Sequence, residues 1–270
     1  MLYSMHRAVA VCTLLIAPLL AQAPPEFEVA SLKPNHSGFP GFSIIPSQGG
    51  KLDANNISLK RLIAVAYSVT DFQIFGNVAW LESDRYDMAA RAPGPAGLPQ
   101  LRLMLRTLLA DRFKLQIHHE SREMRIYTLT QPNASAAAAG VVASEGECSA
   151  ETTPQAALKN GTPCGVVNMG PGRINGQRGR ISQLCDRLST LLSVTVVDKT
   201  GLQGNYNITM AWTPDPEAER TLTGDRPPAS DGPGPTVFAA IQEQLGLKLT
   251  AGKGPVEVIV IDSVEKATAN

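Results

Sequence analysis

Two histidines and a glutamate are consecutive at His118, His119 and Glu120, and side chains of these types bind metal ions or transfer protons. Successive side chains of a β-strand point to opposite faces, so only His118 and Glu120 would share a face of a strand. Two ligands without a third make a weak metal site. The sequence therefore favours a structural strand here, and it predicts neither a metal nor another cofactor.

A second chemical motif is Asp198-Lys199-Thr200-Gly201, which repeats the start of the phosphorylated segment of P-type ATPases. A phosphoryl-accepting aspartate requires a magnesium site and a nucleotide-binding domain around it. Moreover, Leu202 stands where that segment continues with threonine. Aspartate and threonine also stabilise turns by bonding to nearby backbone, so we predict a turn here.

The sequence contains no complete catalytic signature. It has no Gly-x-Ser-x-Gly segment, the arrangement that exposes a nucleophilic serine. Gly170, Gly172 and Gly176 lack the preceding strand and following helix that a phosphate-binding loop needs. We therefore predict no catalytic residue and lean towards a protein that is not an enzyme.

Four aromatic residues, Trp80, Tyr86, Tyr206 and Trp212, are candidates for ligand contact. Binding sites favour the boundary between domains, where these rings could form the rim of a groove. Large aromatics also dominate protein cores, and core packing is the alternative that the sequence favours.

Cysteine usage predicts one disulfide. Cys148 and Cys164 lie in the same polar stretch, and a bond between them would close a loop of about 15 residues, worth roughly 3 kcal/mol in the chain-entropy model. Cys185 lies in a helical pattern, where a small buried thiol is expected. No Cys-x-x-Cys pair is present, which argues against a zinc ribbon.

The first 23 residues resemble a secretory signal peptide. Arg7 precedes an apolar run at residues 8–20, and Ala21-Gln22-Ala23 fits a cleavage site, although Pro24 directly follows it. The run is shorter than the roughly 20 residues of a membrane-spanning helix. We expect a periplasmic or secreted protein with no stable membrane span after the signal is removed.

Charge indicates no particular partner. The chain has 24 basic and 24 acidic residues, so it lacks the basic surface of a nucleic-acid-binding protein. The hydrophobic fraction of 43% is ample for packed cores.

Residues 24–130 are predicted to form a first α+β module. Ser58 is the expected N-cap of a helix with an apolar stripe at the i, i+3, i+4 spacing. A second helix follows around Leu101 to Leu109. The predicted strands are residues 27–32, 42–45, 72–75 and 85–92, with a hairpin formed by residues 113–119 and 125–130.

Residues 131–177 lose both periodicities and are predicted to be a flexible linker. The second module, residues 178–270, is predicted to begin with a helix capped by Ser182. A strand–turn–strand hairpin is expected from Val194 to Trp212, then a helix between Thr236 and Gly246. A closing hairpin of residues 247–249 and 256–261 would turn at Gly252 and Gly254.

The two modules are predicted to be related, each with two helices packed on a small mixed or antiparallel sheet. Arg85-Tyr86-Asp87 matches Asn205-Tyr206-Asn207, and Phe113-Lys114-Leu115 matches Leu247-Lys248-Leu249. Mixed helices and hairpins indicate the α+β class.

Four blocks of sequence, in order, carry a resemblance to a known family. They are Phe27–Pro34, Leu109–Leu115, Val197–Leu202 and Glu243–Leu249. Together they resemble the soil-associated protein family of unknown function that is expanded in Acidobacteria. That family has no established reaction. Some relatives carry this domain on the outer side of membrane-bound, sensor-like metallopeptidases, so the resemblance implies binding or sensing.

A weaker similarity concerns the order of elements. The leucine-rich helix, the Val-Val-Asp strand end at 196–198, the Tyr206 strand and the Leu-Gly-Leu helix end at 245–247 are similar to the short N-terminal domain of secretins and TonB-dependent receptors. Those domains are interaction modules of the envelope and not catalysts.

These observations lead to one expected function and two alternatives. We expect an exported, non-enzymatic protein that binds another envelope protein or an extracellular ligand. One alternative is a secreted hydrolase of an unrecognised type with His118, Glu120 or Asp198 in its site. The other is a stable scaffold whose function lies in its loops. The sequence predicts no nucleic-acid partner and specifies no oligomeric state.

Overall fold

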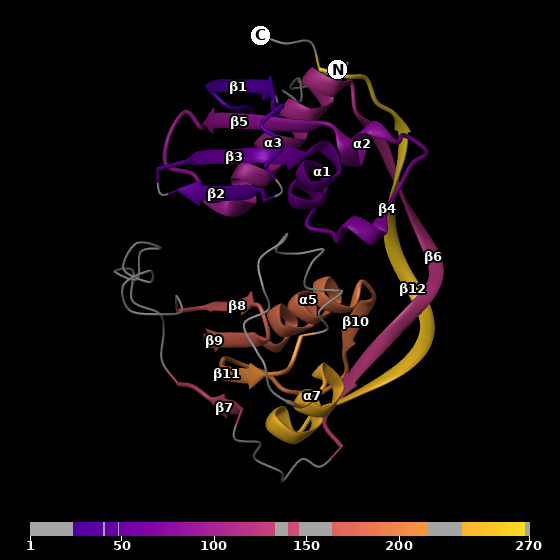
Figure 1. The fold of residues 1–270 in the computed structure, drawn as a ribbon. Coiled ribbons are helices and arrows are strands. Elements are labelled where there is room, and N and C mark those ends of the chain that lie inside the picture. Colours follow the sequence, from indigo (N-terminus) through magenta and orange to yellow (C-terminus); the bar gives the residue numbers. More distant parts are fainter. Residues whose placement is uncertain are drawn as a thin grey trace, which may run out of the picture.

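The computed structural model describes residues 24–39, 41–47, 49–132, 140–145, 164–214 and 234–267. The predicted signal peptide lies outside these residues. The described chain contains three four-stranded sheets together with helices, so the predicted α+β class is confirmed. Two lobes are joined by a long pair of strands that runs along one side of the molecule (Figure 1). Among the described residues, none of the helices has the length and apolar character that crossing a bilayer requires.

The N-terminal lobe, or N-lobe, is a sheet covered by helices on one face. Its strands β1 (Val29–Pro34), β2 (Ser43–Ser47), β3 (Lys51–Ser58) and β5 (Arg85–Arg91) pair antiparallel in the order β1-β5-β3-β2. Helices α1 (Leu59–Tyr67) and α3 (Leu98–Phe113) pack on it. Ser58 caps α1 as predicted, because its Oγ accepts from the Arg61 N–H at 3.3 Å.

Strand β3 was not predicted from the sequence. Leu52 and Ala54 face the core, but a β-bulge between Ala54 and Ile57 interrupts the period-two pattern. Asn56 adopts a positive φ of 52° in this bulge.

The C-terminal lobe, or C-lobe, has a similar layout. Strands β7 (Val141–Ala143), β8 (Val166–Gly170), β9 (Arg173–Gly179) and β11 (Tyr206–Ala211) form a sheet in the order β7-β11-β9-β8. Helices α5 (Ile181–Leu192) and α7 (Val237–Leu245) belong to this lobe (Figure 1). Thr236 caps α7 and Gly246 ends it with φ 62°, as predicted.

Two predictions for this lobe were wrong. The N-cap of α5 is Arg180 and not Ser182, because the Gln183 side chain accepts from the Arg180 N–H at 3.0 Å and fixes the helix start there. The predicted linker contains β7, β8 and the start of β9. β7 has only three residues and β8 only five, while β9 is polar and glycine-rich, so none of them shows a long apolar alternation. Backbone pairing with β11 and β9 defines these strands.

The largest correction concerns the two predicted hairpins at the ends of the modules. Residues Gln116–Thr130 form one uninterrupted strand, β6, and Lys248–Ser263 form another, β12. The two pair antiparallel with each other along their length, from Lys248 opposite Thr130 to Ser263 opposite Gln116. We call this pair the ribbon.

Gly254, which suggested a turn, has another role in the ribbon. A Cβ at this position would lie 2.8 Å from the Ile126 Cδ1, so the glycine gives room to a side chain of the opposite strand. The residues near Glu120, between the two predicted strands of the other hairpin, lie within β6, and several of them are exposed.

Two short strands extend the ribbon at its edges. Strand β4 (Ile74–Phe75) pairs parallel with β12, and β10 (Thr195–Asp198) pairs parallel with β6. The predicted hairpin from Val194 to Trp212 was therefore wrong, because β10 belongs to the ribbon sheet and β11 to the C-lobe sheet. The glycines Gly201 and Gly204 do have positive φ, but they lead the chain from one sheet to the other.

The lobes share a strand order. Adding six to each strand number converts β1-β5-β3-β2 into β7-β11-β9-β8. In the ribbon sheet β10-β6-β12-β4, exchanging the strands whose numbers differ by six gives the same order read backwards. A common origin of the lobes stays a prediction, since matching topology does not establish related sequences.

Candidate functional site

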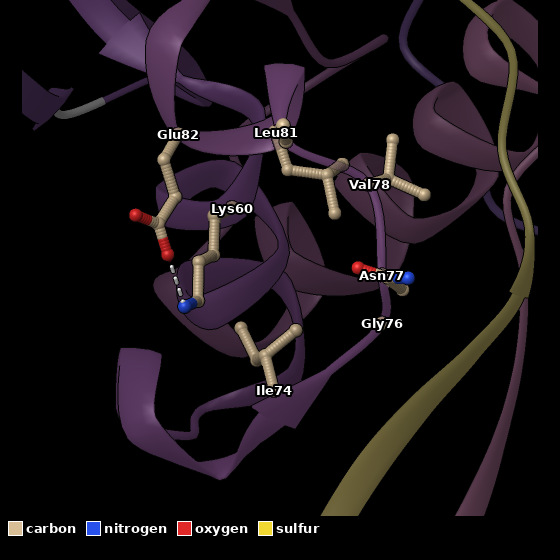
Figure 2. Close-up of a pocket in the computed structure, with 8 residues that line it drawn as sticks. Lys60, Ile74, Gly76, Asn77, Val78, Leu81 and Glu82 are labelled. Carbon is tan, nitrogen blue, oxygen red and sulfur yellow. Dashed lines mark hydrogen bonds and ion pairs between the residues drawn. The ribbon is translucent and has the colours of Figure 1, made fainter.

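A pocket of about 330 Å³ opens in the N-lobe between α1, β4 and the short helix α2 (Trp80–Ser83). Figure 2 shows the side chains around it. It is lined by Lys60, Ile74, Gly76, Asn77, Val78, Ala79, Leu81 and Glu82. This volume is at the lower end of the range of about 300–1,000 Å³ for ligand pockets, so it suits a small molecule.

The ribbon holds one wall of the pocket. Ile74 lies beside Ile259 of β12, and the Gln73 side-chain amide donates to the Glu257 carbonyl at 2.9 Å. At Gly76 an added Cβ would lie 3.1 Å from the Ile261 Cβ, so the absence of a side chain lets the segment pass close to β12.

The floor of the pocket is apolar. Ile74 and Leu81 are 7% and 3% exposed, and both belong to the N-lobe core. Val78 is half-buried and packs on the same core. Because Ile74 and Leu81 are almost completely covered, the surface that the pocket offers to a ligand is more polar than apolar.

An ion pair lies at the rim. The Lys60 Nζ is 2.6 Å from the Glu82 Oε1. The lysine side chain is 21% exposed and the glutamate side chain 69% exposed, so the cation is much the more buried partner. Asn77 is exposed on another side of the pocket (Figure 2).

The lining residues can bind, but they do not form a reaction centre. They supply one ammonium, one carboxylate, one side-chain amide and an apolar floor. None of the lining side chains is a serine, cysteine, threonine or histidine, and the one lysine, Lys60, is already paired with Glu82. In the described part of the chain, no cluster of three or more histidine, cysteine or acidic side chains is arranged to hold a metal ion.

The N-lobe contains a second, smaller hollow of about 240 Å³. It lies over β1, β3 and β5, and it is lined by Ser31, Lys33, Asp53, Asn55, Asp87, Met88 and Ala89. The Asp87 carboxylate already accepts from the Asn35 side chain at 2.7 Å and from the Asn56 N–H at 2.8 Å. Because it is also smaller than the first pocket, this hollow is the weaker candidate.

The predicted aromatic residues lie in two separate cores. Trp80 is half-buried against the N-lobe core, and Tyr86 packs edge-on to Phe113 with ring centroids 5.2 Å apart. Burial, followed by the charge of Asp84, raises the pKa of Tyr86. Tyr206 and Trp212 are each 9% exposed in the C-lobe core.

The structure thus does not gather these four rings into one groove, and their burial favours the core-packing alternative. Ligand contact by them stays a prediction. Trp80 is the one nearest the pocket in sequence, because the next two residues of α2, Leu81 and Glu82, line it.

The two histidines of the first motif each pair with a carboxylate from β12. His118 Nδ1 is 2.8 Å from the Asp262 Oδ1, and His119 Nδ1 is 2.7 Å from the Glu257 Oε1. The Glu120 carboxylate instead accepts from Arg122, and this hydrogen bond lowers the pKa of Glu120. His118 and Glu120 therefore have different partners.

Asp198 forms the predicted turn. Its Oδ1 accepts from the Thr200 N–H at 2.9 Å and from the Thr200 hydroxyl at 2.8 Å. Asp198 stands opposite Leu129 of β6, eleven positions along that strand from His118. At about 3.3 Å per residue the two are roughly 36 Å apart, so they cannot act in one site.

The cysteines are only partly described. Cys148 lies outside the described residues, so its pairing with Cys164 stays a prediction. Cys185 is a free, buried thiol, as predicted. Burial, with smaller contributions from the charges of Asp198 and Asp186, raises its pKa to about 12.

Sequence reasoning did not identify the pocket. Lys60 and Glu82 are 22 positions apart, and neither belongs to a motif. The available signals were a lysine in the first turn of a helix and the Gly76-Asn77 pair after a short apolar strand. Neither signal shows that the two segments meet.

Comparison with known proteins adds a family but no activity. Residues 60–264 match the model of a family described as "Protein of unknown function (DUF3738)", and the match includes every residue of the pocket. No curated protein and no solved structure is similar to the chain.

Proposed function

The chain belongs to this family of unknown function, and we propose that it is an exported, non-catalytic protein that binds a small extracellular ligand in the pocket between α1, β4 and α2. The pocket carries the proposal: it has a buried apolar floor, a charged rim and a volume suited to a small molecule. A concave site in which a few polar groups converge is the usual starting point for a ligand-site hypothesis.

Support for export comes from the sequence. The apolar run at residues 8–20 and the small residues before Pro24 have the form of a cleavable signal. The ligand would then be a molecule of the periplasm or of the surrounding medium. The soil association and the likeness to secretin and TonB-receptor domains belong to this proposal, and they suggest a role in the envelope.

A hydrolase is the second candidate, and one observation favours it. The pairing of His118 with Asp262 is the half of a catalytic triad that orients an imidazole as a base. Both side chains are about half exposed, at 53% and 46%, and neither lines the pocket. The pocket therefore supports binding more directly than this pair supports catalysis.

A ligand screen on the mature protein tests the proposal. We would record the melting temperature against a library of small metabolites for the native chain, for Ala79→Trp and for Ala89→Trp. Ala79→Trp places a bulky ring in the pocket, whereas Ala89→Trp places the same ring in the second hollow. Compounds that stabilise the native chain and Ala89→Trp, but not Ala79→Trp, would support the proposal.

Two results would contradict it. In the first, no compound shows this dependence on Ala79. In the second, the native chain hydrolyses a substrate and His118→Ala or Asp262→Asn abolishes the turnover, which would establish the hydrolase instead.

A further inference from the structure

We propose that the two lobes open and close relative to each other about a hinge in the middle of the ribbon. The hinge is formed by Glu123–Ile126 of β6 and Gly252–Pro255 of β12, which pair with each other in antiparallel register. This inference does not depend on the proposed ligand, because it concerns how the lobes are connected and not what the pocket binds.

The first argument is that the ribbon is the main connection between the lobes. The extensive contacts among the described helices and strands lie within one lobe or between a lobe and the ribbon sheet, and none of them joins an N-lobe element to a C-lobe element. Each lobe also has its own hydrophobic core. Figure 1 shows one lobe attached towards each end of the ribbon. Domains without a large apolar interface are expected to move relative to each other.

The second argument is that the sheet is narrowest at the hinge. Strand β10 pairs with β6 from Ile126 to Leu129, and β4 pairs with β12 at Ile259 and Val260. Between these two stretches the described sheet is only two strands wide. A two-stranded ribbon twists more than a wider sheet and is only marginally stable by itself, so it bends at a lower cost.

The residues of the hinge offer little resistance to bending. Gly252 and Gly254 have no side chain to pack, and Pro255 has no N–H to donate to the neighbouring strand. Glu123 and Lys253 are exposed, and a Cβ added at Gly252 would have no neighbouring atom within 4 Å. These positions therefore have few contacts to lose when the ribbon changes its angle.

Aromatic contacts anchor the ribbon to one lobe on each side of the hinge. On the N-lobe side, the Arg122 guanidinium lies 4.3 Å from the centroid of the Phe75 ring in β4. On the C-lobe side, the centroids of the Tyr127 ring and the Phe238 ring in α7 are 5.5 Å apart. Each anchor would move with its own lobe, so the bend is confined to the residues between Arg122 and Tyr127.

One pair of opposite charges would favour the closed arrangement. Arg102 in α3 and Asp186 in α5 lie close enough for their charges to interact. Burial and the charge of Arg106 lower the pKa of Arg102, and the Asp186 carboxylate opposes this change. The Arg102 Nε is nevertheless buried without a hydrogen-bond partner in the described part of the chain. A closer approach of the lobes would let this nitrogen bond to Asp186.

Pulsed electron paramagnetic resonance on the mature chain tests the hinge. Spin labels would be attached to ketone-bearing residues introduced at Ala110 in α3 and Glu243 in α7, which are exposed positions in different lobes. A second pair, at Ala110 and Arg91, lies within the N-lobe and gives the width expected for a rigid body. We expect the distance distribution between the lobes to be about twice as wide as the one within the N-lobe.

Two valine variants locate the motion. Gly252→Val places a stiff β-branched side chain in the hinge, at a position with free space around it and without a positive φ. Thr250→Val is the matched control, because Thr250 lies two residues away, opposite Thr128, where β10 adds a third strand. We expect Gly252→Val to reduce the width of the distribution between the lobes by roughly a third and Thr250→Val to leave it unchanged. Circular dichroism would verify that each variant is folded.

A charge variant tests the closed arrangement. Arg102→Met should shift the mean distance between the lobes, because the attraction to Asp186 is lost. Lys33→Met is the control, since Lys33 is an exposed lysine of β1, and it should leave the mean unchanged. A distribution between the lobes as narrow as the one within the N-lobe would overturn the inference. A wide distribution that Gly252→Val leaves unchanged would overturn the position of the hinge, and an unchanged mean in Arg102→Met would overturn the closing contact.

Discussion

The N-lobe and the C-lobe share a topology but differ in the connection that follows the short strand at the edge of the ribbon. In each lobe a short strand at the edge of the ribbon leads through a connection to a strand that begins at or next to a buried tyrosine, Tyr86 in β5 and Tyr206 in β11. In the N-lobe the connection contains Gly76, Asn77 and α2, and it lines a pocket. In the C-lobe it begins with the Asp198 turn, which is closed by two hydrogen bonds from Thr200.

The helices that precede the two short strands, α1 before β4 and α5 before β10, also differ between the lobes. Lys60 is the second residue of α1, and at the same place in α5 stands Ser182, which is exposed. The N-lobe thus has a half-buried lysine facing its connection, whereas the C-lobe has a neutral side chain. The comparison indicates that one framework can present a connection as a ligand site or close it with its own hydrogen bonds.

The largest expected effect is at the pocket floor. Leu81→Ala should lower the free energy of unfolding by about 2–5 kcal/mol, because Leu81 is 3% exposed and its loss leaves a cavity. Leu202, in the corresponding C-lobe connection, is only half-buried, so Leu202→Ala should cost less, about 1 kcal/mol. Urea denaturation of both variants measures the difference. Equal losses would show that the two connections contribute alike to their cores.

The next effect appears at alkaline pH. Cys185 is the fifth residue of α5, where α1 has the apolar Ile63. The pKa of the Cys185 thiol is raised from 9.0 to about 12, so between these values the unfolded chain releases the proton and the folded chain keeps it. The free energy of unfolding should therefore fall by about 1.4 kcal/mol per pH unit above pH 9 relative to Cys185→Val.

Urea denaturation at pH 8, 9 and 10 checks this prediction. Plotted against pH, the free energies of unfolding of the native chain and of Cys185→Val should diverge only above pH 9. If the two plots stay parallel up to pH 10, the pKa of Cys185 is not raised, and α5 and α1 behave alike at this position.

A smaller effect is expected at the C-lobe turn. Asp198→Ala removes the acceptor of two hydrogen bonds from an exposed turn, and it should cost about 1 kcal/mol of unfolding free energy. Asn77→Ala, the exposed residue of the N-lobe connection, should change stability by less than about 0.5 kcal/mol. Amide hydrogen exchange at Thr200 should accelerate in the first variant only. A comparable loss in Asn77→Ala would mean that the N-lobe connection is also held by its own side chains.

The same contrast explains which features the sequence could predict. Helix starts at Ser58 and Thr236, the helix end at Gly246 and the Asp198 turn were predicted correctly, because each depends on side chains within a few residues of the backbone that they bond. The ribbon could not be predicted this way. His118 stands opposite Val260, and nothing near either residue specifies a partner so distant in the chain.

The pocket could not be predicted either, because its residues come from segments that are distant in the chain. Gly76 is needed because Ile261 passes close to it, and Lys60 matters because α2 brings Glu82 within 2.6 Å. Both conditions arise only when the ribbon and the helices pack. The two local signals that misled the prediction, Gly252 and Gly254, are typical of turns but here lie within a strand.

The smallest expected effect tests whether the rim ion pair exists for stability or for binding. An exposed glutamate paired with a lysine contributes about 0.2–1 kcal/mol, and Glu82 is 69% exposed, so Glu82→Gln should lower the free energy of unfolding by no more than this amount, and by less in high salt. Urea denaturation at low and high salt measures both values. The C-lobe folds with Ser182 in place of the lysine, which fits a rim that the framework does not require. If Glu82→Gln instead cost more than 2 kcal/mol at any salt concentration, the pair would be a structural part of the N-lobe, and the difference between the lobes would reflect packing and not a ligand.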